Sequence, residues 1–191
     1  MVIGLAGKYC SGKSEAARIL GETGFRVIDV DALGHEALDE RRDEVAAAFG
    51  ERILAPDGRV DRRKLGGVVF ADSAKLKTLE AIVHPRVREK ITSLLEASGE
   101  PSVIHAALLF SGGLDKLCDH IIIITAPLLD RINRGLARDS LGIMAVFRRI
   151  WKQRSLIPQS SYLPADTIIV RNSGTRKELR EAVLEAASHF T

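Results

Sequence analysis

One short loop near the start of the chain restricts the possible folds more than any other feature. It reads Gly7-Lys8-Tyr9-Cys10-Ser11-Gly12-Lys13-Ser14, which fills every fixed position of the pattern glycine, four residues, glycine, lysine, serine or threonine. The apolar run Val2 to Ala6 predicts a buried strand before the loop, and the spacing from Glu15 to Leu20 predicts a helix after it. A strand, a glycine-bearing loop and a helix in this order favour an α/β fold that holds a phosphate chain at the helix N-terminus.

The residues of this loop indicate how a nucleoside triphosphate would be held. Gly7 and Gly12 let the backbone turn closely, so that several N–H groups converge on the phosphates. Lys13 places a positive charge on the β- and γ-phosphates, and the Ser14 hydroxyl completes the coordination of a Mg²⁺ that otherwise keeps several waters. We therefore predict ATP and Mg²⁺ as cofactors, with Ser14 as the metal ligand. The predicted nucleotide contacts in this region are Gly7, Tyr9, Cys10, Ser11, Gly12, Lys13, Ser14 and Glu15.

Two aspartates follow the second predicted strand, Phe25 to Asp29. Asp29 and Asp31 are two positions apart, so if strand geometry persists they point the same way, beyond the phosphate loop. Open α/β sheets bind ligands at this end of their strands, and phosphoryl transfer uses a carboxylate that orients the acceptor's proton. Asp31 is the candidate for that role; alternatively it only caps the following helix. His35 is either an acceptor contact on the same helix face or a histidine that is merely packed or solvated.

The rest of the chain alternates between strands and helices around a helical insertion. Between Asp31 and Gly99 the pattern is mostly helical, with a helix boundary expected at His84-Pro85. The remaining strands are predicted at Ser102 to Phe110, His120 to Thr125 and Thr167 to Val170, and further helices at Pro127 to about Ser140 and Thr175 to Phe190. This alternation argues for right-handed crossovers between parallel strands. We expect an α/β fold with a five-stranded, mostly parallel sheet and helices on both faces.

Composition argues against several other classes of protein. Lys plus Arg number 28 against 25 Asp plus Glu, without a basic block of the kind that binds nucleic acid, so no nucleic-acid partner is expected. The two cysteines, Cys10 and Cys118, are too few for a disulfide framework or a four-ligand zinc site. No targeting pattern opens the sequence, and no apolar run approaches the roughly 20 residues that span a bilayer. A reduced cytoplasmic protein with no membrane partner is the simplest interpretation; the oligomeric state is not predicted.

Further motifs occur in a fixed order along nearly the whole chain. The first two are Ile3 to Ser14 and Val27 to Ala32, of which the second is the more selective. They are followed by Asp57-Gly58, Arg62 to Leu65, Val69-Phe70, Ile82 to Val87, Leu108 to Phe110, Arg134, Arg138-Asp139, Gln153, Ala165-Asp166 and Asn172 to Gly174. In order and spacing these motifs resemble the dephospho-CoA kinase family. The His-Pro element and the Asn-x-Gly ending weigh most, because generic P-loop proteins give no reason for either.

The resemblance implies a P-loop NTPase fold of the nucleoside-monophosphate-kinase type, with a helical substrate insertion and a lid. It also implies ATP-dependent phosphorylation of the ribose 3′-hydroxyl of dephospho-coenzyme A, the last step of coenzyme A biosynthesis. Lys13, Asp31 and Arg138 become the implied catalytic residues, with Arg138 a lid arginine on the transferring phosphates and Asn172 close to adenine. The implied acceptor contacts are Asp31, His35, Arg62, Leu65 and His84. For Arg62, Leu65 and His84, surface charge or helix packing is the ordinary alternative.

The same resemblance divides a single kinase domain, residues 1–191, into three parts. The nucleotide-binding core takes about 1–30, 100–138 and 156–191, the acceptor-binding insertion about 31–99, and the lid about 139–155. Arg134 and Arg138 lie one helical turn apart and present two guanidinium groups on one face, which suits a lid that closes on phosphate. Closure would keep water away from the γ-phosphate.

The chain departs from the family pattern at several positions. Lys8-Tyr9-Cys10 replaces small residues, so the two bulky side chains must point away from the nucleotide, and Glu15 places an acid beside the Mg²⁺ site. Ala107 and Ser111 stand where the family has proline and glutamate. Two other functions therefore stay open. The chain could be another P-loop kinase acting on a nucleotide, a nucleoside or a sugar acid, or a non-catalytic ATP-binding regulator.

Overall fold

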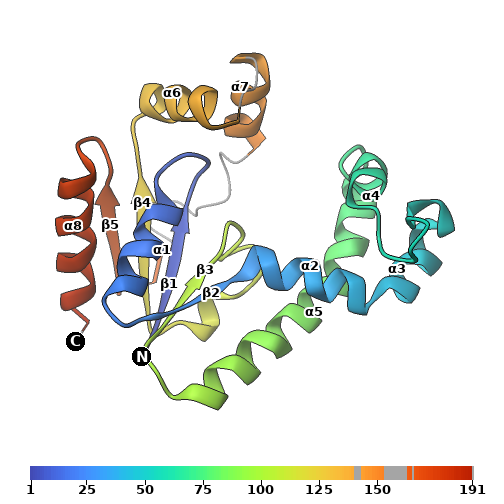
Figure 1. Ribbon diagram of the computed structural model, residues 1–191, viewed down its shortest axis with the longest axis horizontal. Coiled ribbons are helices and arrows are strands. Elements are labelled where there is room, and N and C mark those ends of the chain that lie inside the picture. The colour runs from blue at the N-terminus through green and yellow to red at the C-terminus, as the bar shows by residue number, and fades with distance from the viewer. Residues whose placement is uncertain (140–142, 153–162, 165, 191) are drawn as a thin grey trace. The chain divides into compact units, whose positions relative to one another are not determined.

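The structure is a computed structural model that describes residues 1–139, 143–152, 163–164 and 166–190. Five strands form one sheet in the order β2-β3-β1-β4-β5, and each neighbouring pair is parallel. They are β1 (Val2–Gly7), β2 (Arg26–Asp29), β3 (Ser102–His105), β4 (His120–Thr125) and β5 (Thr167–Arg171) (Figure 1). The predicted α/β fold with a five-stranded parallel sheet is confirmed.

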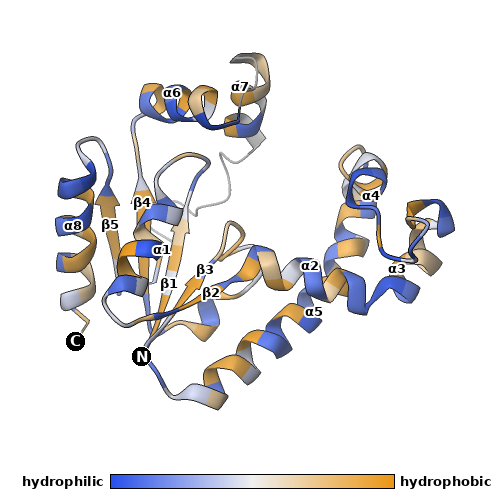
Figure 2. Ribbon diagram, in the orientation of Figure 1, coloured by the Kyte–Doolittle hydropathy of each residue, from blue (hydrophilic) through white to orange (hydrophobic). Residues whose placement is uncertain are grey.

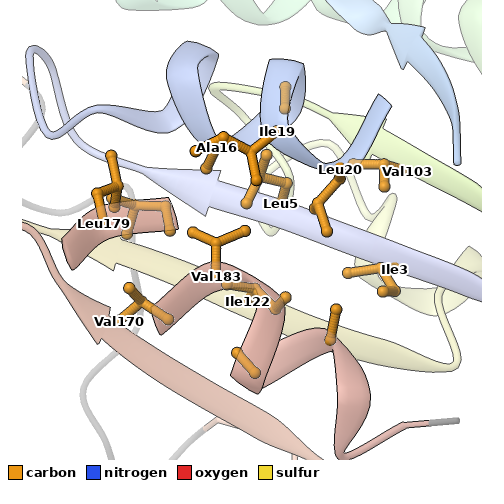
Figure 3. Packing of buried hydrophobic residues seen from close by; sticks show 14 residues of the cluster. Ile3, Leu5, Ala16, Ile19, Leu20, Val103, Ile122, Val170, Leu179 and Val183 are labelled. Carbon is orange, nitrogen blue, oxygen red and sulfur yellow. The ribbon is translucent and has the colours of Figure 1, made fainter. Parts of the chain in front are cut away.

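One face of the sheet is covered by two helices, α1 (Lys13–Glu22) and α8 (Arg176–Ser188). Figure 3 shows Leu20 of α1 and Val183 of α8 packed with Ile122 of the sheet, and all three side chains are fully buried. Burying each such side chain contributes roughly 1.5–3 kcal/mol to folding. This shared core fixes α1, and with it the loop that precedes the helix.

The central strands are buried on both faces. Ile121 to Ile124 of β4 are all nearly inaccessible, and in Figure 2 the strands are coloured mainly as hydrophobic. Such continuous apolar runs are typical of parallel strands, whose two faces are both covered. On the face opposite α1 and α8, a Cβ on Gly4 would lie 2.8 Å from Cys118 Sγ and 2.9 Å from Leu109 Cδ2. The segment between β3 and β4 therefore packs directly on β1.

That segment shows that the predicted end of the third strand is wrong. The sequence predicts a strand to Phe110, but β3 ends at His105. The chain then turns, with Gly112 N–H donating to the Leu108 carbonyl over 2.8 Å and Leu109 buried against the sheet. A short helix η2 (Asp115–Leu117) follows. The apolar run was long enough for a strand, but the chain turns back in its second half, where Ala106 and Leu109 are buried and Leu108 is exposed.

Two helices follow β4, namely α6 (Leu128–Asp139) and α7 (Ile143–Lys152). Their bounds fall within the expected helix from Pro127 and the expected lid at about 139–155. Residues 140–142 and 153–155 of that lid, including Gln153, lie outside the described residues, as does Ala165.

Residues 30–98 form a compact unit of their own, distinct from the unit of residues 1–29 and 99–191 that carries the sheet. Its helices are α2 (Val30–Glu40), α3 (Arg42–Phe49), η1 (Glu51–Ile53), α4 (Arg62–Val69) and α5 (Ser73–Ser98). Its apolar core consists of Leu38, Val45, Phe49, Ile53, Val60, Leu65 and Val69. Because this core lies wholly within residues 30–98, the segment is stabilised by its own packing.

Pro85 lies inside α5, so the helix boundary predicted at His84-Pro85 is wrong. A proline inside a helix removes one backbone hydrogen bond and costs about 3 kcal/mol or more. Val87 and Ile91, which follow within two turns, are buried. Their burial holds the chain helical through Pro85, a contribution from tertiary packing that the local sequence does not contain.

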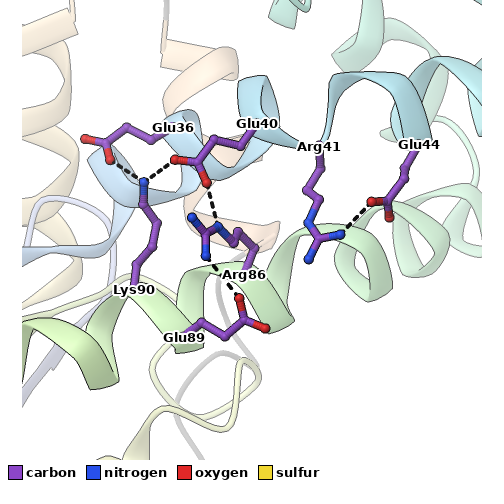
Figure 4. Close-up of polar contacts among 7 residues, drawn as sticks. All are labelled: Glu36, Glu40, Arg41, Glu44, Arg86, Glu89 and Lys90. Carbon is purple, nitrogen blue, oxygen red and sulfur yellow. Dashed lines mark hydrogen bonds and ion pairs between the residues drawn. The ribbon is translucent and has the colours of Figure 1, made fainter.

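An ion-pair network joins α2 to α5 (Figure 4). Lys90 Nζ lies 2.8 Å from Glu36 Oε2 and 2.5 Å from Glu40 Oε1, and Arg86 Nε lies 2.6 Å from Glu40 Oε2. Arg86 also pairs with Glu89 one turn along its own helix. Hydrogen bonds from Lys90 and Arg86 hold the pKa of Glu40 below its ordinary value. Isolated surface pairs stabilise little, whereas this carboxylate bridges two cations and two helices.

We expect Glu40→Gln to reduce the acid sensitivity of this helical unit. Because the folded state lowers the pKa of Glu40, the carboxylate stabilises the fold above its unfolded pKa, about 4.5, and this contribution is lost as the pH falls through the folded value. In thermal unfolding at pH 7, the variant should have a lower melting temperature than wild type. The difference between the two melting temperatures should become smaller below pH 4.5. The control is Glu44→Gln, which breaks a pair with Arg41. A gap that did not change with pH would contradict the prediction.

Candidate active site

The carboxyl ends of the parallel strands meet at one edge of the sheet, where α/β folds bind ligands. At this edge Gly7 closes β1, and the phosphate loop leads into α1 at Lys13. The N-cap residue of α1 is Gly12, which makes no side-chain capping bond. The first backbone N–H groups of α1 lie at the positive end of the helix dipole, which suits an anion.

Both fixed glycines of the loop are required by close packing. A Cβ on Gly7 would lie 2.6 Å from Ser11 Oγ and 2.9 Å from the Ile124 carbonyl oxygen. Gly12 has φ 103, in the left-handed region that favours glycine, and a Cβ there would collide with Asn172 Nδ2. These two positions let the backbone itself form the wall of a binding site.

We expect Gly12→Ala to destabilise the protein and abolish ATP binding, because the new methyl group must push Asn172 away from the loop. Gly24→Ala is the matched control, since Gly24 also has positive φ but has nothing within 4 Å of the position of a Cβ. Strain alone should cost about 1–3 kcal/mol in both variants. Thermal melting and ATP titration calorimetry separate the two effects. Normal ATP affinity in Gly12→Ala would show that the collision is relieved without moving the loop.

A cavity of about 510 Å³ opens over this loop, within the usual size range of small-molecule sites. Six of the nucleotide contacts predicted between Gly7 and Glu15 line it, namely Cys10, Ser11, Gly12, Lys13, Ser14 and Glu15. The cavity is also lined by four further basic residues, Lys8, Arg134, Arg138 and Arg176. Together with Lys13 they make five basic side chains against one acid among the described residues of the lining. A site with this excess of positive charge attracts a polyanion such as a triphosphate.

The Glu15 carboxylate, which lines the cavity, is neutralised by a residue of its own helix. Arg18 Nη2 donates to Glu15 Oε1 over 2.7 Å, and Arg18 Nε donates to Oε2 over 3.3 Å. The hydrogen bond from Arg18 is the main cause that lowers the pKa of Glu15. Because the carboxylate is already paired, its repulsion of a phosphate group is reduced.

Asn172, the first residue after β5, holds the phosphate loop in place. Its side chain is 7% exposed, and its Nδ2 donates to the Ser11 carbonyl over 2.8 Å. Arg134 Nη2 donates to the Asn172 carbonyl over 3.2 Å and to Asn172 Oδ1 over 3.3 Å. The Asn172 N–H donates to the Thr125 carbonyl over 2.7 Å. Asn172 thus connects the ends of β4 and β5 to the loop after β1.

A second cavity, of about 320 Å³, adjoins the first and shares Gly12, Glu15, Arg134 and Arg176 with it. Asn172, Gly174 and Leu179 complete its lining. A nucleotide whose phosphates occupied the larger cavity could extend toward this one. The predicted position of Asn172 near adenine is compatible with that arrangement.

The unusual loop residues differ in where they lie, and the expectation that Lys8 points away from the nucleotide is wrong, because Lys8 lines the larger cavity. Cys10 lines the larger cavity and has φ 56, a value that residues other than glycine adopt only rarely. Tyr9 is absent from that lining; its ring is 9% exposed and packs with residues of α6 and α7. The bulky ring thus points away from the cavity, as its size requires, and any contact of Tyr9 with a nucleotide would come through its backbone.

Asp31 is the second residue of α2 and is exposed. β2 ends at Asp29 and α2 begins at Val30, so the strand geometry that would have aligned Asp29 with Asp31 does not persist. Asp31 lies within the first helical turn rather than at the cap position, and a carboxylate there interacts favourably with the helix dipole. His35, one turn further along α2, is also exposed.

The remaining acceptor-side candidates are also in the helical unit. Arg62 begins α4 and is exposed, after the Asp61 carboxylate that accepts from the Arg63 and Lys64 N–H groups. Leu65 is 3% exposed and belongs to the core of the unit, so packing accounts for it. His84 is half-buried on α5, just before Pro85.

Sequence reasoning did not single out Arg176 or Arg131. Arg176 lines both cavities from the first turn of α8, where a cation is unfavourable beside the helix dipole; that placement was a readable signal of a nearby anion site. Arg131 is 8% exposed, and its Nε donates to the Tyr9 carbonyl over 2.8 Å. Burial lowers the pKa of Arg131. An arginine on the buried face of a helix is the sequence signal that was missed here.

Comparison with known proteins places this geometry in a family. The sequence pattern of the dephospho-CoA kinases matches residues 1–178. The chain belongs to the dephospho-CoA kinase family. It is 37% identical to the dephospho-CoA kinase of Geobacter sulfurreducens, over 96% of this chain and 95% of that one, and 38% identical to that of Thermobifida fusca, over 96% and 92%. The predicted family is confirmed, and membership makes the chain a kinase, a transferase that uses ATP.

Solved structures agree on the fold of the dephospho-CoA kinase family. A crystal structure from Thermus thermophilus matches with a TM-score of 0.85 and 32% identity, covering 100% of this chain and 98% of its own. A dephospho-CoA kinase from Campylobacter jejuni matches with a TM-score of 0.71 and 23% identity, covering 99% and 96%. At that identity the second match supports the fold alone.

Two of the departures from the dephospho-CoA kinase pattern have a structural account. The Tyr9 ring is accommodated by packing outside the cavity, and the Glu15 charge is compensated by Arg18. Ser111, in place of the family's glutamate, is exposed, and Ala107 is half-buried; nothing in the structure explains these two replacements. None of these positions removes a basic group from the phosphate cavity.

Proposed function

We propose that this protein transfers the γ-phosphoryl group of ATP to the ribose 3′-hydroxyl of dephospho-CoA, giving coenzyme A and ADP. The observation that carries the proposal is the basic cavity over the N-terminus of α1, in a chain that belongs to the dephospho-CoA kinase family. The phosphates would occupy the larger cavity, with the nucleoside toward the smaller one beside Asn172. The binding of ATP follows from family membership; its pose and its residue contacts are part of the proposal.

The core unit would stabilise the charge that moves during transfer. Backbone N–H groups from Gly7 to Ser14 would bind the phosphate oxygens, and Lys13 would bridge the β- and γ-phosphates. Arg138 lies on the cavity wall and would contact the transferring group. Such preorganised donors lower the barrier because they need not reorient as charge develops on the β–γ bridging oxygen.

The residues around Ser14 fit a magnesium ion that is held mainly by phosphate. Ser14 is the second residue of α1, its side chain is exposed, and it lines the cavity beside Lys13. A single hydroxyl suits Mg²⁺, which usually keeps several waters and binds substrate phosphates rather than a protein cage. When bound, Mg²⁺ would neutralise charge on the phosphate oxygens. Glu15, already paired with Arg18, is a less available ligand.

The helical unit of residues 30–98 would hold the acceptor. Asp31 would accept the proton of the 3′-hydroxyl while that oxygen bonds to the γ-phosphorus and the bond to the β–γ bridging oxygen breaks, so that ADP leaves with the electron pair. Only Val30 separates Asp31 from Asp29, the last residue of β2 at the edge of the sheet where ligands bind. His35, Arg62 and His84 would contact dephospho-CoA, with Leu65 supporting them from the core of the unit.

We also propose that the protein works in the reducing cytoplasm. Both cysteines are free, and burial raises the pKa of the Cys118 thiol to about 12, which keeps it unreactive. Among the described residues, no helix is both long enough and apolar enough to cross a membrane.

One assay tests the proposed reaction. Purified protein, ATP and Mg²⁺ are mixed with dephospho-CoA, with a nucleoside monophosphate or with gluconate, and ADP release is followed. We expect ADP formation to depend on dephospho-CoA and the product to carry a 3′-phosphate. Faster turnover with gluconate or a nucleotide would favour another P-loop kinase. ATP binding with no acceptor-dependent ADP would favour a regulator.

A further inference from the structure

Tyr9 joins the phosphate loop to the two helices that follow β4. Its ring shares an apolar cluster with Ile132 of α6 and with Val146 and Ile150 of α7. The ring approaches α6 so closely that a Cβ on Gly135 would lie 2.9 Å from Tyr9 Cε1. Tyr9, which is much larger than the family's usual loop residue, therefore forms part of the contact between the phosphate loop and these two helices.

The Tyr9 hydroxyl reaches a carboxylate that three donors share. It donates to Asp139 Oδ2 over 2.5 Å, and Arg149 Nη1 donates to the same oxygen over 2.6 Å. Arg138 donates from Nε to Oδ1 over 2.7 Å and from Nη2 to Oδ2 over 3.2 Å. The Asp139 side chain is only 16% exposed, and these bonds, the one from Arg138 first, hold the pKa of Asp139 well below its usual range. The carboxylate is therefore ionised whenever the protein is folded near neutral pH.

Arg138 is the member of this cluster that also lines the nucleotide cavity. The two bonds to Asp139 occupy Nε and Nη2, and within the described part of the chain Nη1 makes no hydrogen bond. The Arg138 Cζ lies 5.1 Å from the centroid of the Tyr9 ring, within the range of a cation–π contact. The Arg138 side chain is restricted by the bidentate bond to Asp139 on one side and by the face of the Tyr9 ring on another, whereas a free arginine samples many rotamers.

We propose that Tyr9 and Asp139 are positioning residues, which hold the Arg138 guanidinium at the cavity wall so that Nη1 is presented to the transferring phosphate. Neither side chain touches the substrate; both act through Arg138. The inference rests on the proposed function, in which Arg138 contacts the γ-phosphate. The loop that binds the triphosphate thereby also orients an arginine that stabilises its transfer.

The alternative is that the cluster only fastens α6 and α7 to the core. The two roles differ in a measurable way. If Tyr9 and Asp139 act through Arg138, removing either hydrogen bond should have no further effect on kcat once Arg138 has been replaced. If they only pack the helices, removing either bond should lower kcat even without Arg138. A double-mutant cycle measures this difference.

The experiment uses Tyr9→Phe and Asp139→Asn, each alone and combined with Arg138→Ala. Tyr9→Phe keeps the ring and removes only the hydroxyl, so it tests the inference even if Asp139→Asn folds poorly. Each single variant should lower kcat about tenfold, as expected when a hydrogen bond to a charged group is lost, with KM for dephospho-CoA within about twofold of wild type. Arg138→Ala should lower kcat by on the order of 10². Adding either change to Arg138→Ala should alter kcat by less than about twofold.

Controls separate this inference from the proposed function. Asp130→Asn, an acid on the same helix outside the cluster, should have normal kcat. Full additivity in the Arg138→Ala background, or normal kcat in both Tyr9→Phe and Asp139→Asn, would overturn the inference while leaving the proposed reaction intact. A neutral Arg138→Ala would remove Arg138 from the proposed mechanism and the positioning role with it. The same cycle measured on ATP affinity by titration calorimetry needs no acceptor, so it tests the coupling even if dephospho-CoA is not phosphorylated.

Discussion

Replacing Lys13 with alanine should lower turnover with dephospho-CoA by on the order of 10² or more while leaving the protein folded. Lys13 opens α1 on the wall of the basic cavity, where its ammonium would follow the charge that builds up between the β- and γ-phosphates. Its loss removes stabilisation of the transition state more than binding of the ground state. kcat should therefore fall more than KM for ATP rises, as measured by steady-state ADP release.

Lys8→Ala is the matched control for this prediction. Lys8 lines the same cavity, so the variant loses the same unit of positive charge from the same site. It lies outside the fixed positions of the phosphate-loop pattern, and we expect less than a tenfold loss of kcat. Equal losses in the two variants would mean that the cavity acts only through its total charge, and that Lys13 has no specific place in the reaction.

Asp31→Asn should also lower kcat by on the order of 10² or more, with ATP affinity close to wild type. The amide keeps the size of the side chain but cannot take the proton of the attacking hydroxyl. The ordinary alternative is that Asp31 only complements the dipole at the start of α2. In that case the variant would lose a little thermal stability and keep a near-normal rate. Measuring both kcat and the melting temperature decides between these roles.

The control for Asp31→Asn is Asp43→Asn, another acid in the first turn of a helix of the same unit. Its side chain is 95% exposed. If helix electrostatics were all that mattered, the two variants would behave alike. A slow Asp31→Asn beside a normal Asp43→Asn is the result we expect.

The parts of the fold that could be read from the sequence are those set by local pattern. The loop from Gly7 to Ser14 combines fixed glycines, a lysine and a hydroxyl residue whose roles depend only on their neighbours in the chain. The isoleucine run of β4 and the amphipathic pattern of α8 likewise report burial directly. Five strands and the position of the phosphate cavity followed from these signals.

The errors came where distant parts of the chain override local preference. Pro85 should end a helix on its own, but the burial of Val87 and Ile91 keeps α5 continuous. The run from Ser102 to Phe110 could have been one strand, yet the chain turns after His105 and buries Leu109 against β1. Tertiary packing decides both cases, and periodicity in a short window does not contain it.

The Asp139 cluster could not be predicted for a similar reason. The hydrogen bond from Tyr9 to Asp139 joins residues 130 positions apart, and nothing near either residue indicates the other. The sequence did show that the Tyr9 side chain had to leave the cavity. The position of the Tyr9 ring depends on Gly135, because a residue without a Cβ leaves room for the ring at that point of α6.

The hydrogen bond from Asn172 Nδ2 to the Ser11 carbonyl spans 161 positions, so the phosphate loop is completed by a residue that follows β5, the last described strand of the chain. A polypeptide still attached to the ribosome, with β5 not yet released, would contain Ser11 and Gly12 but would lack the Asn172 amide that holds the Ser11 carbonyl. We therefore expect incomplete translation products that end before Asn172 to bind ATP more weakly than the complete chain.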